Sequence, residues 1–163
     1  LPAALKMGQP RYQEVSAETI PMVEKEGAKV RLVAGEIEGV QGPVTEIAAN
    51  PVYIDVELES GSAFSYSIPW GHTAVAYVFE GEAAFGVDEH GQGKQVNAVR
   101  MAEFSDGDQL QVQTNPGSGV RFMLIAGAPF NETIVPYGPF VMNTPQEIQQ
   151  ALADLRNGTF VKT

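Results

Sequence analysis

The chain has 163 residues, of which 44% are hydrophobic and 18% charged, and its 10 basic and 20 acidic side chains give a net charge of −10. A chain of this length and composition is expected to form one globular domain, and no apolar run reaches the roughly 20 residues that cross a bilayer. The negative charge repels phosphate backbones and anionic lipids, so we expect neither nucleic acid nor a membrane as a partner. Because the chain has no cysteine and only two histidines, thiolate chemistry is excluded and a metal site would depend on carboxylates.

The first 21 residues contain Pro2, Pro10 and Pro21, which rule out a long helix and predict a linker that leads into the fold. The sequence begins at Leu1 without an initiator Met, a basic leader or a long apolar stretch. We therefore expect a piece cut from a longer polypeptide, with a cytoplasmic location.

Short runs rich in Val, Ile, Tyr and Phe follow, each bounded by turn residues, and they predict about eight strands. The predicted strands are Lys29–Gly35, Tyr53–Glu59, Ala63–Ile68, Thr73–Glu80, Glu82–Val87, Val96–Met101, Gln109–Thr114 and Val120–Gly127. Alternating apolar and polar residues in two of these runs, Tyr53–Glu59 and Gln109–Thr114, indicate strands with one buried face. Gly81 is expected to reverse the chain between two strands. The pattern is typical of an all-β sandwich or jelly-roll barrel.

Near the end of the chain the periodicity changes to that of a helix, predicted over residues 145–157. Thr144 is a capping residue followed by Pro145, Glu147 completes a capping box, and Gly158 is placed to end the helix. An apolar stripe runs along this helix at i, i+3, i+4 and i+7 and consists of Ile148, Ala151, Leu152 and Leu155. Since a helix this short is marginal alone, the stripe must be buried. Its partner is either the rest of this chain or a second domain or copy, which makes it a candidate interdomain or oligomer contact.

The segments around Gly81 and Ser105-Asp-Gly-Asp108 resemble the two sequence motifs of the cupin superfamily, whose members are small β-barrels that bind metal through histidines and a glutamate. Ala74 stands at the glutamate position of the first motif and Leu110 at the histidine position of the second. The positions where the histidines of the first motif would lie hold Ser67, Ile68, Pro69 and Trp70, none of which is a side-chain metal ligand, and Thr114 takes the place of a closing asparagine in the second motif. We therefore expect no catalytic, cofactor-binding or metal-binding residue in this chain.

At a finer level the chain resembles the C-terminal half of the pirin family, whose members have two cupin barrels. The resemblance rests on motifs distributed along nearly the whole chain: Lys6-Met7, Pro10–Gln13, Val33–Glu36 with Gly42-Pro43, Pro69–Thr73 with Tyr77–Gly81, Gly127–Glu132, and Tyr137–Thr144 with Gly158–Phe160. It implies an all-β, cupin-like (RmlC-type) jelly-roll β-barrel with one C-terminal helix. The implied domains are a lead-in from a missing N-terminal barrel over 1–21, the barrel over 22–142, and the helix and tail over 143–163.

The resemblance also implies a function for the parent protein. In the pirin family the N-terminal barrel holds a mononuclear iron, and family members are associated with quercetin 2,3-dioxygenase activity or with co-regulation of transcription factors. We expect this chain to be a metal-free, non-catalytic second barrel that supports the missing iron-bearing barrel of a quercetin 2,3-dioxygenase-like oxidoreductase. The alternative is a protein-interaction module of a transcriptional co-regulator. Besides the missing barrel, a second copy of the fragment is an expected partner.

A third alternative is a small-molecule pocket inside this barrel, lined by Tyr66, Trp70, His72, Tyr77 and Phe122. The competing interpretation is that these side chains fill the barrel, as in most eight-stranded barrels.

Two other groups of polar residues could form a functional site or could be ordinary surface residues. The Asp88-Glu89-His90 run belongs to a polar hairpin tip, where a weak surface cation site competes with a solvated loop. Asp106 and Asp108 flank a turn glycine and could form an acid–base pair, although such a turn normally exposes them.

Overall fold

The computed structural model describes residues 1–161, and the chain divides into two compact units. One unit is Val15–Pro129, which we call the barrel unit. The other joins Leu1–Glu14 to the segment that begins at Phe130, and we call it the helical unit. None of the helices among residues 1–161 is long and apolar enough to cross a membrane.

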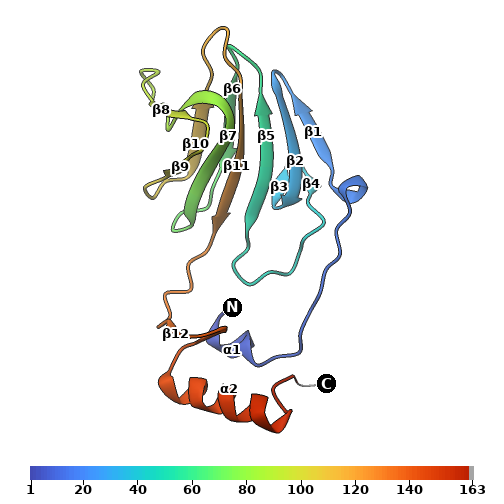
Figure 1. Cartoon of the computed structure of the whole chain (residues 1–163). Coiled ribbons are helices and arrows are strands. Elements are labelled where there is room, and N and C mark those ends of the chain that lie inside the picture. Colours follow the sequence, from blue (N-terminus) through green and yellow to red (C-terminus); the bar gives the residue numbers. More distant parts are fainter. Residues whose placement is uncertain (162–163) are drawn as a thin grey trace. The chain divides into compact units, whose positions relative to one another are not determined.

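The barrel unit is built on a curled antiparallel sheet (Figure 1). Its strand order is β1-β2-β5-β11-β7-β10-β6, with β8 and β9 also paired to β7. The strands are β1 (Met22–Lys25), β2 (Ala28–Ala34), β5 (Val52–Leu58), β6 (Ala63–Ser67), β7 (Thr73–Phe85), β8 (Lys94–Asn97), β9 (Arg100–Glu103), β10 (Gln109–Gln113) and β11 (Val120–Gly127). A short 3-10 helix (Ala17–Thr19) precedes β1, and a hairpin of β3 (Glu36–Ile37) and β4 (Val40–Gln41) follows β2. The mostly β, cupin-like fold is confirmed.

The core of the barrel unit forms because buried and exposed residues alternate along the strands. In β5 the side chains of Val52, Ile54, Val56 and Leu58 are buried, while the residues between them face outward. At the centre, the ring of Phe122 lies edge-on to the rings of Phe64 and Phe85, at centroid distances of 6.2 Å and 5.1 Å. These rings fill the interior and fix which face of each strand is buried.

Gly81 does not reverse the chain, and this prediction was wrong. A single long strand, β7, runs through Gly81, which has φ of 69° and lies beside a register shift in the pairing with β11. A Cβ at Gly81 would lie 2.0 Å from the carbonyl oxygen of Gly119, so only glycine fits here. The glycine therefore permits a close approach of two strands and is not part of a turn.

The predicted strand Val96–Met101 is also corrected, because the structure has two strands in this region. β8 pairs with the second half of β7 and β9 with its first half. Val99 lies between them with φ of 62°, a conformation that interrupts an extended chain. The long strand β7 provides partners for both short strands.

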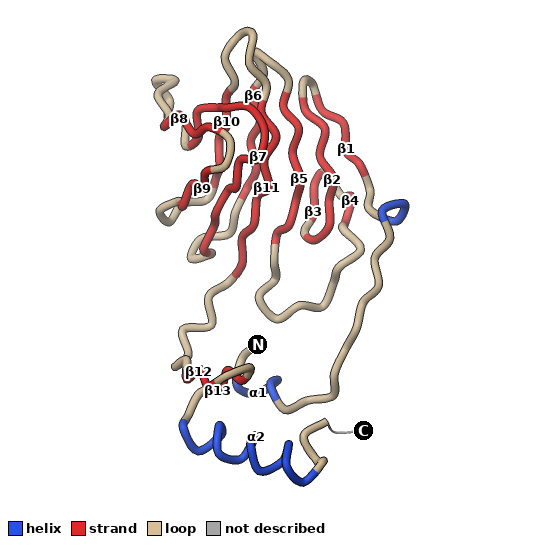
Figure 2. Tube along the Cα trace, in the orientation of Figure 1, coloured by secondary structure: helices blue, strands red, loops and turns tan. Residues whose placement is uncertain are grey.

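The helical unit contains a short helix α1 (Ala3–Lys6), a hairpin of β12 (Val135–Tyr137) and β13 (Phe140–Met142), and the helix α2 (Pro145–Asn157), as the tube in Figure 2 shows. The predicted helix 145–157 is confirmed with its capping box. The backbone N–H of Glu147 donates to Thr144 Oγ1 at 3.2 Å, and the Glu147 carboxylate accepts from the backbone N–H of Thr144 at 2.8 Å. Gly158 ends the helix with φ of 71°.

Half of the predicted apolar stripe of α2 is fully buried. Ile148 and Ala151 pack in a small cluster with Phe140 and Met142 of β13. Leu152 is partly buried against the same cluster, as are Met7, Val135 and Phe160, whereas Leu155 is 56% exposed. The helix therefore finds its partner in the β12–β13 hairpin of its own unit.

The structure groups residues differently from the expected ranges 1–21, 22–142 and 143–163. The β12–β13 hairpin belongs with α2 and not with the barrel, because Phe140 and Met142 bury their side chains against the helix. Residues 1–14 are also part of this unit, tied to it by hydrogen bonds from Lys6 Nζ to Asn143 Oδ1 (2.7 Å) and from the Ala3 N–H to Glu132 Oε2 (2.7 Å). They are thus an integral part of a folded unit.

Candidate functional site

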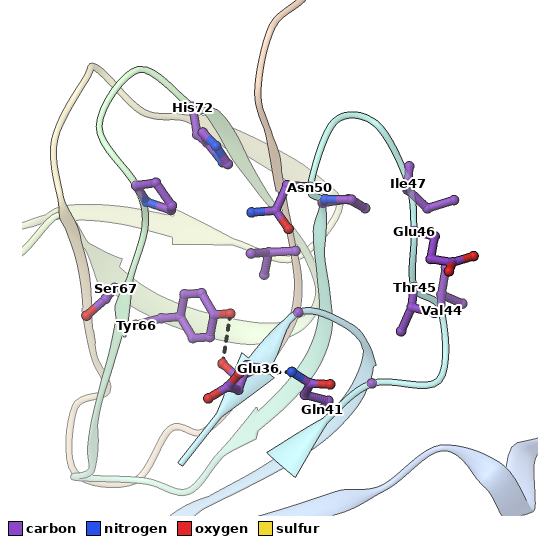
Figure 3. A pocket seen from close by; sticks show the side chains of 15 residues that line it. Glu36, Gln41, Val44, Thr45, Glu46, Ile47, Asn50, Tyr66, Ser67 and His72 are labelled. Atoms are coloured by element: carbon purple, nitrogen blue, oxygen red, sulfur yellow. Dashed lines mark hydrogen bonds between the residues drawn. The ribbon is translucent and has the colours of Figure 1, made fainter. Parts of the chain in front are cut away.

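A cavity of about 490 Å³ opens within the barrel unit (Figure 3). Its walls come from four segments: the β3–β4 hairpin, the following loop through Pro51, the end of β6, and the turn before β7. This volume lies in the range of small-molecule sites in proteins. The cavity is therefore the candidate functional site of this unit.

Tyr66 on β6 forms one end of the cavity. Its side chain is 9% exposed, and its hydroxyl donates to the backbone carbonyl of Glu36 at 3.2 Å, which links β6 to the β3–β4 hairpin (Figure 3). Burial raises the pKa of the Tyr66 hydroxyl above its ordinary value of 10.0. The group is therefore a neutral phenol at physiological pH, with its oxygen still able to accept a hydrogen bond.

His72, in the turn before β7, lines the opposite end of the cavity. Its Nδ1 atom is buried and has no hydrogen-bond partner among the described residues. The turn itself is well anchored, since the N–H of Gly71 donates to Asp106 Oδ1 at 2.8 Å and the N–H of His72 donates to the carbonyl of Pro69 at 3.2 Å. The imidazole and the side-chain amide of Asn50 point toward one another (Figure 3).

The backbone around the cavity has unusual conformations. Gly35 has φ of 102°, and a Cβ there would lie 3.1 Å from the Tyr66 hydroxyl. Two residues other than glycine, Glu46 and Asn50, also line the cavity with positive φ, at 57° and 44°. This conformation is unfavourable for Glu46, whereas asparagine adopts it more readily.

Acidic side chains are part of the cavity lining. Glu36 and Glu46 contribute carboxylates to its lining, and no Lys or Arg lies among the described residues that line it. The Glu36 carboxylate accepts a hydrogen bond from Gln41 Nε2 at 3.2 Å.

The structure brings together two of the five predicted pocket residues. Tyr66 and His72 line this cavity. Phe122 is fully buried in the core, whereas the side chains of Trp70 and Tyr77 are 67% and 40% exposed. Trp70 faces solvent because it stands in a turn, and Tyr77 because it points outward from β7.

Sequence reasoning missed Glu36, Gln41 and Asn50 as lining residues. The available signal was the pair Gly35 and Gly42, where a Cβ on Gly42 would lie 2.6 Å from the Val33 carbonyl. These glycines allow the β3–β4 hairpin to approach the barrel, which the sequence pattern alone does not show.

The positions aligned with cupin metal ligands hold side chains that do not fit a metal. Ala74 and Leu110 are buried at 4% and 3% exposure and belong to the apolar core. Buried Thr114 donates to the carbonyl of Glu59 at 2.6 Å and accepts from the N–H of Ser62 at 2.9 Å, which ties two turns together. Among residues 1–161 no three His, Cys, Asp or Glu side chains gather where they could hold a metal ion.

The remaining candidates serve local structure. Asp88 Oδ1 accepts from the backbone N–H groups of His90 and Gln92, which shapes the hairpin tip, and the His90 ring lies 3.7 Å from the Glu89 carboxylate with both side chains exposed. The Asp106 carboxylate accepts from the N–H of Gly71, as described above.

Comparisons with known proteins agree with the fold. The family profile described as the Pirin C-terminal cupin domain matches residues 53–161. Pirin from Homo sapiens is 37% identical over 152 residues, which is 93% of this chain and 51% of that protein. The chain thus spans about half the length of the curated relatives it matches.

Two solved structures show the same architecture. A quercetin 2,3-dioxygenase from Acinetobacter baumannii superimposes with a TM-score of 0.82 and 31% identity, over 98% of this chain and 54% of that chain. An RmlC-like cupin from Shewanella frigidimarina, at 16% identity and a TM-score of 0.50, covers 76% of this chain and 96% of that chain and supports the fold alone. Since the family profile covers most of the sequence, this chain belongs to the pirin family, where it corresponds to the C-terminal cupin domain.

Proposed function

We propose that this chain is the metal-free second barrel of a two-barrel pirin-like protein and that it supports an iron-bearing N-terminal barrel. The observation that carries this proposal is the chemistry at the aligned ligand positions. Ala74 and Leu110 offer only carbon atoms, in an interior packed with apolar side chains. A transition metal there would have neither nitrogen nor oxygen ligands, and its buried charge would be uncompensated.

For the intact parent we infer a quercetin 2,3-dioxygenase-like activity. The support is the similarity to the quercetin 2,3-dioxygenase from Acinetobacter baumannii, whose chain is about twice as long as the matched part. In this proposal the N-terminal barrel supplies the iron, and this chain contributes stability and a contact surface and takes part in no chemical step.

The helical unit is the proposed contact surface for the N-terminal barrel. It exposes large apolar side chains despite its small size, including Tyr137 (58%), Val141 (52%) and Leu155 (56%). In this proposal these side chains belong to one apolar patch, and such patches are typical of interaction sites. A neighbouring barrel would cover them and strengthen the unit.

The test compares the intact parent with residues 1–163 alone. We expect one iron per chain and quercetin turnover for the parent, and neither for residues 1–163, as measured by elemental analysis and oxygen consumption. Stoichiometric iron or zinc in residues 1–163 would contradict the metal-free assignment.

A matched pair of substitutions tests the contact surface. Leu155→Ser should lower the unfolding midpoint of the parent but barely change that of residues 1–163. Met101→Ser provides the control, because Met101 is 63% exposed on the barrel unit and should have little effect in either protein. Equal losses for Leu155→Ser in both proteins would rule out the proposed contact.

The alternative function is a protein-interaction module of a transcriptional co-regulator. The net charge of −10 favours it, because an acidic surface steers association with basic partners. A parent protein that lacks quercetin turnover, combined with a salt-sensitive partner that residues 1–163 retain alone, would favour this function over the supporting role.

A further inference from the structure

We propose that the outer face of the sheet in the barrel unit, over β5, β11 and β7, is a docking surface for the N-terminal barrel of the parent protein. The partner is the second barrel of the proposed function, on which this inference therefore rests. The surface is separate from the one proposed on the helical unit. Its three strands are neighbours at the centre of the sheet (Figure 1).

Five apolar side chains form one patch on this outer face, which we call the sheet patch: Tyr53, Val75, Tyr77, Met123 and Ile125. Ile125 on β11 pairs with Tyr53 on β5 and with Val75 on β7. Met123, two residues earlier on β11, pairs with Tyr77 on β7. Residues paired across antiparallel strands have their side chains on the same face. The residues that alternate with them along each strand are buried in the core.

The sheet patch is open to solvent in this chain. Ile125 is 42% exposed, Tyr77 40% and Tyr53 38%, while Val75 and Met123 are half-buried. Contiguous exposed apolar residues on a folded domain are typical of a surface that another element covers.

Elsewhere on the sheet the outward positions carry the polar residues of an ordinary solvated strand. The exposed residues of β10 are Gln109, Gln111 and Gln113, and those of β2 are Lys29 and Arg31. An antiparallel strand with one face in water normally alternates apolar residues inside with polar residues outside. The central strands depart from this rule at the sheet patch, which supports a docking role for that part of the face.

The charges beside the sheet patch are paired within the chain. Asp55 lies opposite Met123 in the strand register and so borders the patch. Its carboxylate accepts from Arg121 Nε at 3.1 Å and from Arg121 Nη2 at 2.7 Å, and Arg31 Nη1 lies 3.6 Å away. A domain that covers this region would therefore bury no unpaired carboxylate, which would otherwise be costly.

The length of the related proteins indicates what covers the sheet patch. This chain spans 51% of human pirin and 54% of the quercetin 2,3-dioxygenase from Acinetobacter baumannii, so the remainder of such a protein is about as large as this chain. In the proposed function that remainder is a second barrel with an outer sheet face of its own. Two sheets pack face to face, about 10 Å apart, through side chains such as those of the sheet patch.

A second copy of this chain is the competing occupant, and both charge and size disfavour it. Each copy carries a net charge of −10, so two copies repel one another. Stable interfaces between separate chains usually involve about 20–30 residues on each side. The sheet patch is much smaller, but a barrel in the same chain needs less contact because the linker keeps it at a high effective concentration.

Met101 marks the margin of the docking surface. It lies opposite Tyr77 on β9, which is paired with β7 at the side of the sheet, and it is 63% exposed. Residues at the rim of a contact contribute little to its energy, whereas central residues dominate. We therefore expect Ile125, between Tyr53 and Val75, to be the most strongly covered position.

Thiol labelling tests the docking surface directly, because residues 1–163 contain no cysteine. Ile125→Cys is made in the intact parent and in residues 1–163, and mass spectrometry of the peptide that carries residue 125 follows its reaction with iodoacetamide. Labelling in the parent should be about tenfold slower or more, as for a contact that is open at most a tenth of the time. Gln111→Cys, on the outward face of β10, is the matched control and should react equally fast in both proteins. Equal rates at residue 125 would overturn the proposal.

Two further measurements separate the alternatives. Protection of residue 125 that appears in residues 1–163 and disappears on dilution would identify a second copy as the occupant and overturn the proposal. Iron analysis of the parent distinguishes this inference from the proposed function. An iron-bearing parent that turns over quercetin but leaves residue 125 unprotected would overturn the docking surface alone. A parent without iron in which residue 125 is protected would support the docking surface and contradict the iron-bearing role of the N-terminal barrel.

Discussion

The two units of this protein differ sharply in how they are stabilised. The barrel unit buries one continuous apolar cluster drawn from nearly every strand, with nine residues at 0% exposure, including Phe122, Ile54 and Leu32. Among its described residues, the helical unit has four buried apolar side chains with four partly buried ones packed against them, and a capping box and side-chain hydrogen bonds add to this small core. Burial of apolar surface is the dominant favourable term in folding. The barrel unit is therefore stabilised by its own core, whereas the helical unit depends more on local polar contacts and on the partner that covers its exposed apolar side chains.

The largest effect is expected in the centre of the barrel. Phe122→Ala removes a fully buried ring that contacts the rings of Phe64 and Phe85, and it should cost about 3–5 kcal/mol of unfolding free energy. Chemical denaturation followed by circular dichroism measures this loss. Ile125→Ala, on the outward face of the same strand, is the control and should cost less than about 1 kcal/mol. Similar losses would contradict the assignment of the core.

A smaller and more local effect is expected for Ile148→Ala in α2. Ile148 is one of the four buried residues of the helical unit, and the substitution should cost about 2 kcal/mol. Hydrogen exchange should show lost protection in α2 with unchanged protection in β5 and β11. The exposed Gln149→Ala on the same helix should retain protection. Lost protection throughout the barrel would show that the two units unfold together.

The capping box should contribute about 1 kcal/mol. Thr144→Ala removes the oxygen that accepts from the N–H of Glu147, which leaves a helix N–H without its partner. The stability of α2, measured by hydrogen exchange, should fall by that amount. Thr133→Ala, at an exposed position outside the helix, is the matched control. If both variants behave alike, the cap does not stabilise the unit.

The smallest effect is a pH dependence confined to the helical unit. Backbone hydrogen bonds to the Glu147 carboxylate, first from Asn143 and then from Thr144, lower its pKa below the ordinary value of 4.5. A lowered pKa in the folded state stabilises the protein above pH 4.5, and this contribution is lost as the pH falls below that value toward the folded pKa. Hydrogen exchange at several pH values should show α2 weakening in that window, whereas Glu147→Gln should remove the dependence. A wild-type helix with no change below pH 4.5 would contradict this prediction.

Local patterns predicted the elements whose residues determine their own conformation. The helix 145–157 was identified from Thr144, Pro145, Glu147 and Gly158, because each of these residues acts on backbone groups within a few positions of itself. The strand Val120–Gly127 was predicted with its observed bounds because its buried and exposed residues alternate. In both cases the interactions that decide the structure join residues that are close together in the sequence.

The errors involve residues whose partners are distant in sequence. Gly81 looks like a turn residue, but its role depends on the carbonyl of Gly119, 38 positions away. Of the predicted pocket residues, Tyr66 and His72 were brought together by the β3–β4 hairpin and the loop after it. Trp70 and Tyr77 do not line the cavity, because Trp70 stands in a turn and the outward direction of Tyr77 follows from strand pairing, and the sequence pattern leaves both open.

By itself, the sequence determined the all-β class, the capped C-terminal helix and the resemblance to the pirin family. Strand propensities and capping residues act locally, and motif spacing can be compared directly with that of a known family. Tertiary structure alone decided that residues 1–14 and the β12–β13 hairpin join α2 in a second unit, and that a cavity forms between Tyr66 and His72. The physical reason is that burial and cavity formation depend on contacts between segments far apart in the chain, such as the hydrogen bonds of Tyr66 to Glu36 and of Lys6 to Asn143.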